Sequence, residues 1–290
     1  MLGGALGIAL VFAHTSFIGF EATVIYGEEA RSPQRTVPRA TYVALVAMGA
    51  FYAISTWLLT NAYPIADVVG IARDDPEAFA AQALASRLGA ASADVMSVLI
   101  ITSIFAAVLA FHNTLARYLF ALGRQGLMWV SLGRTHPVRQ SPHVACYAQA
   151  ATAVVVIGVF AVAGADPYGN LYVWATGLGA IGIILLQLVA SVAVFTFFRR
   201  RDVDKRRWHT VVAPLLGVLG LLVLAVAALS NFGLLIGVPS AGAPVALGAV
   251  LLCVALAGMA RAVWLRRNAV AVYRRIGAVA DAGGPAHRPA

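Results

Sequence analysis

The sequence contains little charge: Asp, Glu, Lys and Arg make up 11% of its 290 residues, whereas 61% are hydrophobic. A soluble domain normally carries about a quarter charged residues. So few charges cannot cover a water-exposed surface, and the apolar excess must therefore face lipid. The composition excludes an ordinary soluble protein and places the chain in the membrane class.

Other absences narrow the function. The single lysine, Lys205, lies in a charged segment between apolar runs, which excludes a retinal protein that needs a lysine within a span. Neither HExxH nor GxSxG occurs, so we expect no enzyme and no catalytic residues. Cys146 and Cys253 stand singly in apolar runs without metal-ligand spacing, and we expect no metal and no cofactor.

Seven apolar runs are long enough to cross a bilayer, whose core of about 30 Å requires about 20 residues of helix. Because backbone groups in lipid must bond within their own segment, each run predicts an α-helix. The sequence therefore predicts an all-α polytopic membrane helix bundle over residues 1–265, followed by a cytoplasmic tail at 266–290. The expected spans are 2–26, 41–61, 93–120, 144–163, 171–198, 211–232 and 243–265.

The connectors between these runs alternate in charge. Of the 21 Lys and Arg residues, all but Arg73 and Arg87 fall on one side of the expected bundle. The positive-inside rule makes that side cytoplasmic, so we expect a multi-pass plasma-membrane protein with its N-terminus outside and its C-terminus inside. Topology thus accounts for the net charge of +9, and the expected partner is the lipid bilayer and not nucleic acid.

The longest outer connector follows the second run. Asp75 and Pro76 are typical of a helix start, with Asp75 as the cap and Pro76 in the first turn. A short amphipathic helix is expected there, either as a lid or as a helix packed at the interface. Its apolar stripe would consist of Phe79, Ala83 and Leu88.

The first apolar run contains polar and small residues near its middle, with Thr15 and Ser16 followed by Gly19 and then Glu21. Glycine adopts non-helical dihedral angles without steric cost, which favours an interrupted helix. Broken helices of secondary transporters use the freed backbone groups to bind solutes and ions. Glycine that merely packs between helices is the alternative.

Glu21 is the ionisable residue of this run. A carboxylate within a span costs about 2.5–3.5 kcal/mol on insertion scales, so it normally faces a polar interior and has a function. Such a group suits a proton-coupled step. Alternatively, Glu21 lies close enough to the cytoplasmic end to reach water.

Two consecutive motifs resemble the sixth helix and the following loop of the amino acid–polyamine–organocation (APC) superfamily. They read Ser16-Phe-Ile-Gly-Phe-Glu21 and Gly27-Glu-Glu-Ala-Arg-Ser-Pro-Gln-Arg-Thr-Val-Pro38-Arg-Ala-Thr41. Residues 113–136 resemble the family's eighth helix and its loop, and residues 171–201 resemble its tenth. The loop Leu122–Trp129 departs from the family pattern because it lacks the usual acid and proline.

The resemblance implies helices six to twelve of an amino-acid permease, which form the second half of a leucine-transporter-like inverted-repeat fold. The implied function is secondary active transport of amino acids or related amines by alternating access, with proton coupling or solute exchange. Because helices one to five are not in this sequence, we expect the chain to be N-terminally truncated. A missing N-terminal half carrying these helices would then be a partner. An inactive permease fragment and a seven-span receptor are the alternatives.

The resemblance also assigns roles to individual residues. It implies substrate contact for Thr15, Ser16, Ile18 and Gly19, and for Phe111 in the third run. It implies proton coupling or gating for Glu21.

Several polar side chains remain open to two interpretations. His14 either contacts substrate or a proton, or packs through a hydrogen bond. The hydroxyl groups of the third run either meet a cation or bond to their own helix. These hydroxyls belong to Ser97, Thr102 and Ser103.

Overall fold

The structure is a computed structural model that describes residues 5–25, 27, 30, 32–76, 78–200, 206–238, 242–274 and 276. The described residues form helices and turns, and none of them lies in a β-strand. The chain divides into a first unit, Met1–Thr15 with Leu119–Ala290, and a second unit, Ser16–Tyr118. The boundary between them therefore falls inside the first apolar run.

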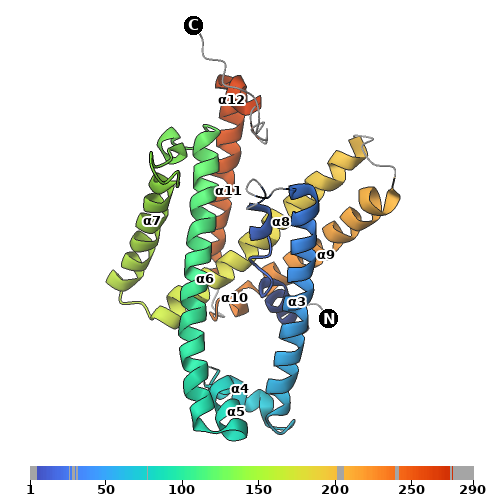
Figure 1. Cartoon of the computed structure of the whole chain (residues 1–290), viewed down its shortest axis with the longest axis vertical. Helices are drawn as coiled ribbons and strands as arrows, with labels where there is room; N and C mark the ends of the chain where they lie inside the picture. The colour runs from blue at the N-terminus through green and yellow to red at the C-terminus, as the bar shows by residue number, and fades with distance from the viewer. Residues whose placement is uncertain are drawn as a thin grey trace. The chain divides into compact units, whose positions relative to one another are not determined.

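The second unit contains two long helices, α3 (Pro33–Asn61) and α6 (Ala90–Arg124), of which α6 continues into the first unit after Tyr118. Their connection passes through α4 (Val68–Asp74) and α5 (Phe79–Leu88) (Figure 1). A short helix, α2 (Ala22–Ile25), precedes α3 and packs against it.

The first unit begins with α1 (Ala5–Thr15) and resumes after α6 with the short 3-10 helix η2 (Val130–Gly133). Four longer helices follow: α7 (His143–Val162), α8 (Val173–Arg200), α9 (Ala213–Ser230) and α11 (Gly242–Asn268). Wide turns of π-helix precede two of them, namely η3 (Pro167–Tyr172) and η4 (Trp208–Val212). The remaining short helices are α10 (Phe232–Leu235) and α12 (Val270–Arg274).

Among the described residues, six helices are long and apolar enough to cross a membrane: 33–61, 90–124, 143–162, 167–200, 208–230 and 242–268. The first apolar run appears instead as a shorter apolar helix over residues 6–15. Several helices extend beyond the expected spans because backbone hydrogen bonding continues into polar residues. The expected tail begins with helix, since α11 ends at Asn268 and α12 follows, while residues 277–290 lie outside the described part.

The expectation for the outer connector was wrong in its details. The helix begins at Phe79, and Asp75 precedes it in a turn, where its Oδ1 accepts the backbone N–H of Ala78 (3.0 Å). Ala83 is buried, but Leu88 is 75% exposed. The residues of the expected stripe therefore do not form one buried face. The Phe79 ring stacks on Tyr63 instead, with centroids 4.7 Å apart.

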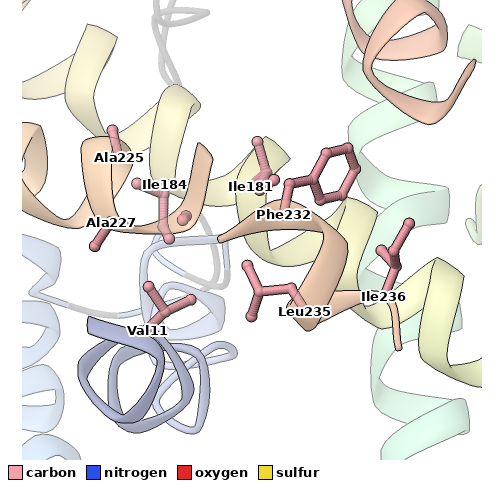
Figure 2. Packing of buried hydrophobic residues seen from close by; sticks show 9 residues of the cluster. Val11, Ile181, Ile184, Ala225, Ala227, Phe232, Leu235 and Ile236 are labelled. Atoms are coloured by element: carbon pink, nitrogen blue, oxygen red, sulfur yellow. The ribbon is translucent and has the colours of Figure 1, made fainter. Parts of the chain in front are cut away.

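The core of the first unit lies where α1 and α8 pack against α9 and α10 (Figure 2). Small residues on α9 let the helix backbones approach closely, which is how helices pack in membranes. Gly177 of α8 has the same role toward α10, because a Cβ there would lie 2.7 Å from Cγ2 of Ile236. The buried cluster consists of Val11, Ile181, Ile184, Ala225, Ala227, Ala228, Phe232, Leu235 and Ile236.

Candidate functional site

The first apolar run is interrupted, as the sequence predicted. Helix α1 ends at Thr15, residues 16–21 form turns, and α2 begins at Ala22. Gly19 has a φ of +113°, a conformation that residues with a side chain rarely adopt. A Cβ on Gly19 would meet no atom within 4 Å. The need for glycine at this position is therefore conformational and not steric.

Glu21 binds the backbone of this interruption directly. Its Oε2 accepts the N–H of Gly19 at 2.9 Å, and both groups are partly buried. In an uninterrupted helix this N–H would bond to the carbonyl four residues earlier. At the interruption, the Gly19 N–H therefore donates to an ionisable side chain and not to a backbone carbonyl.

Tyr52 of α3 contacts the interruption, a contact that the sequence did not predict. Its hydroxyl donates to the carbonyl oxygen of Ser16 at 3.0 Å. Its ring meets Phe17 edge-on, with centroids 5.7 Å apart. Nothing in the sequence marks Tyr52, because aromatic residues are common in apolar runs. Only the contact between α3 and the interruption reveals its role.

Hydroxyl groups hold the end of the interruption to α3. Oγ1 of Thr23 lies 2.7 Å from Oγ1 of Thr41 and donates to the carbonyl of Phe20 at 2.9 Å. Thr41 in turn bonds to the carbonyl of Val37 within its own helix (2.9 Å). Three of the loop residues in the second family motif, Glu28, Glu29 and Arg31, lie outside the described residues.

The remaining expected site residues are not all brought together. Thr15 is the last residue of α1, and its hydroxyl donates to the carbonyl of Phe12 in the same helix (3.0 Å). Ile18 is half-buried in the turn. Phe111 is 44% exposed on α6, and in the described part of the chain α6 makes no extended packing contact with α2 or α3. Its substrate role stays a prediction.

The structure gives hydrogen-bond partners for three of the polar side chains left open by the sequence. His14 is hydrogen-bonded, since its Nε2 lies 2.9 Å from Oε1 of Gln187 on α8. The hydroxyls of Ser97 and Thr102 each donate to the carbonyl four residues earlier (3.0 Å), as expected for bonding to their own helix. Among the described residues, no three His, Cys, Asp or Glu side chains gather into a possible metal site.

The described residues thus form a multi-pass α-helical membrane protein whose first apolar run is interrupted. The sequence model of the amino acid permease family matches residues 3–260. The chain therefore belongs to the amino acid permease family, within the APC superfamily.

Curated relatives are permeases and transporters. The branched-chain amino acid permease BcaP of Bacillus subtilis (strain 168) is 30% identical over 139 residues, covering 48% of this chain and 28% of that protein. BcaP of Lactococcus lactis subsp. cremoris (strain MG1363) is 24% identical over 216 residues, 74% of this chain and 43% of that protein. The methylthioribose transporter of B. subtilis is 27% identical over 220 residues, 76% of this chain and 44% of that protein.

The chain thus spans less than half the length of the curated relatives it matches. No solved structure matches it significantly.

Proposed function

We propose that the interruption between α1 and α2 forms part of the substrate site of a secondary active transporter for amino acids. The observation that carries this proposal is the hydrogen bond from the Gly19 N–H to the Glu21 carboxylate. It places an ionisable group on a backbone amide that a continuous helix would have occupied. Transporters use such released groups to bind solutes.

An amino acid offers the same kinds of group that now occupy the interruption. A substrate ammonium would donate to the carbonyl of Ser16, where the Tyr52 hydroxyl now donates. A substrate carboxylate would accept the N–H of Gly19, which Glu21 now accepts. The substrate would therefore keep the Gly19 N–H and the Ser16 carbonyl hydrogen-bonded, while the Tyr52 hydroxyl and the Glu21 carboxylate are displaced from them.

The relatives favour a neutral amino acid with an apolar side chain, since two of them are named as branched-chain amino acid permeases. Apolar residues of the turn, Phe17, Ile18 and Phe20, would surround such a side chain. Methylthioribose is the second candidate substrate, because a third relative is named as its transporter. Methylthioribose has neither an ammonium nor a carboxylate group. It therefore offers no charged partner for the Ser16 carbonyl or the Gly19 N–H.

Coupling follows from Glu21. A substrate carboxylate on the Gly19 amide would release the Glu21 carboxylate, which would bind a proton on one side of the membrane and release it on the other as alternating access exposes the site. The charge distribution supports a plasma-membrane orientation with the N-terminus outside. Helices one to five, supplied by a further length of polypeptide, would complete the site. Exchange of one solute for another is the alternative form of coupling.

Uptake of radiolabelled L-leucine into proteoliposomes tests the proposal. We would reconstitute the chain alone and together with a polypeptide carrying helices one to five of the family. The expected result is leucine uptake that requires both parts and is stimulated by an inward proton gradient. Uptake of methylthioribose but not leucine would support the second candidate. Uptake of neither solute in both arrangements would contradict transport and favour an inactive fragment. The family match already favours transport over the receptor alternative.

A further inference from the structure

One polar pair joins helices that are far apart in the sequence. His14, next to the last residue of α1, and Gln187, in the middle of α8, are hydrogen-bonded at 2.9 Å across 173 positions of sequence. The ring N–H of His14 donates to the amide oxygen of Gln187, and both side chains are half-buried. The function proposed above does not use this pair.

The pair continues an apolar interface by one helical turn. Val11 precedes His14 by three residues on α1, and Ile184 precedes Gln187 by three on α8. Residues three apart lie on the same face of a helix. Val11 and Ile184 are both fully buried in the shared cluster (Figure 2). Both helices therefore present first an apolar and then a polar residue to the same interface.

The two kinds of contact restrict the helix differently. Apolar packing is non-directional, and it tolerates small rotations and shifts of α1 along its axis. A hydrogen bond requires a donor–acceptor distance near 2.9 Å and a nearly linear arrangement. The His14–Gln187 bond therefore fixes the rotation and the axial position of the last turn of α1.

We propose that His14 and Gln187 are a positioning pair for the interruption that follows α1. Thr15 ends α1 directly after His14, and Ser16 begins the turns that contain Gly19 and Glu21. Thr15 and Ser16 are joined by a peptide bond, so a restraint on the last turn of α1 acts directly on the first residue of these turns. The inference rests on the proposed function for the site, but the pair can be tested without any substrate.

The first experiment measures the position of Thr15 by chemical labelling. Thr15→Cys is introduced into a Cys146→Ala/Cys253→Ala background, and the rate of its reaction with N-ethylmaleimide is measured in proteoliposomes. Interhelical hydrogen bonds in membranes contribute enough to change a local opening equilibrium about three- to tenfold. We expect His14→Leu and Gln187→Leu each to raise the labelling rate by that factor.

The matched controls separate the bond from packing and from loss of polarity. The exchanged pair His14→Gln/Gln187→His can re-form the bond with its partners reversed, and we expect it to restore the original rate to within about twofold. Thr196→Val removes a polar group of α8 that donates to the carbonyl of Val192 within its own helix (2.8 Å), and it should leave the rate unchanged. Unchanged rates in both Leu variants, or no restoration by the exchanged pair, would overturn the proposal.

A second measurement links the pair to transport. In the reconstituted assembly, the Leu variants should raise the KM for L-leucine about three- to tenfold with a maximal rate within about twofold, and the exchanged pair should reverse the effect. Equal KM values would overturn the positioning role while leaving the proposed function intact. An unmodified protein that does not transport leucine would refute the function, while the labelling rates would still decide on the pair.

Discussion

The backbone N–H of Gly19 donates a 2.9 Å hydrogen bond to the carboxylate of Glu21, two residues further along the chain. This bond depends on the φ of +113° at Gly19, which turns the backbone out of the helical path. A single feature thus interrupts the helix and gives the released amide an ionisable partner. Any ligand carboxylate that binds this amide must displace Glu21, which links binding to the state of that side chain.

Replacing Glu21 by Gln tests the charge separately from the hydrogen bond. The Gln oxygen still accepts the Gly19 N–H, so the turn and membrane insertion should be kept. We expect leucine uptake to lose most of its dependence on external pH, because no proton can be taken up at this position. Asp67→Asn on the outer connector is the control and should retain the dependence. An unaltered pH profile would remove Glu21 from the coupling step.

Replacing Gly19 by Ala tests the conformation of the turn. The positive φ should destabilise the folded chain by about 1–2 kcal/mol, since an added Cβ is strained in that region even with open space around it. We expect a lower Tm in detergent and weaker leucine binding. Gly179→Ala is the matched control, because a Cβ there also meets nothing within 4 Å but the residue lies within α8 without a positive φ. Equal Tm values for the two variants would count against the strained turn.

Removing only the hydroxyl of Tyr52 tests its contact with the interruption. Tyr52→Phe keeps the ring against Phe17 and removes the 3.0 Å bond to the Ser16 carbonyl. Because a substrate ammonium would have to displace this bond, its removal is expected to raise the affinity for leucine about two- to tenfold, which corresponds to about 0.5–1.5 kcal/mol. Tyr42→Phe, at a ring that is 71% exposed on the same helix, should have no effect. A Tyr52→Phe variant with unchanged affinity would limit Tyr52 to packing.

Packing between α8 and α10 is tested at Gly177. A Cβ at this position would approach Cγ2 of Ile236 to 2.7 Å and the carbonyl oxygen of Leu235 to 3.2 Å. We expect Gly177→Ala to destabilise the first unit by about 1–3 kcal/mol, measured as a lower Tm. Gly179→Ala, two residues along α8, should be neutral by comparison. Equal stability of the two variants would mean that α8 and α10 are not in close contact.

The interruption could be predicted from the sequence, but its partners could not. Polar residues and glycine are unusual in the middle of an apolar run, and their presence here predicted the interruption. These residues are Ser16, Gly19 and Glu21. Tyr52 and Gln187 carry no such mark, because a tyrosine or a glutamine in an apolar run has many possible partners. Their roles depend on which helices pack together, and apolar periodicity does not specify that.

The helices themselves were largely predictable from the lengths of the apolar runs. Their ends were less so, because the run that begins at Thr41 continues an α3 helix that already started at Pro33. The π-helical turns before α8 and α9 were not predicted, since a wider turn leaves the hydrophobic character of a run unchanged. Phe111 was placed by family resemblance alone, and its role as a substrate contact remains a prediction.

Substrate protection of a cysteine in the interruption tests the central claim most directly. Ser16→Cys in the Cys146→Ala/Cys253→Ala background would be labelled with a maleimide in the reconstituted assembly, with and without saturating L-leucine, and Ser97→Cys on α6 would serve as the reference. We predict that leucine slows labelling at position 16 several-fold and leaves position 97 unchanged. Identical labelling at position 16 in the presence and absence of leucine would contradict the assignment of this turn to the substrate site.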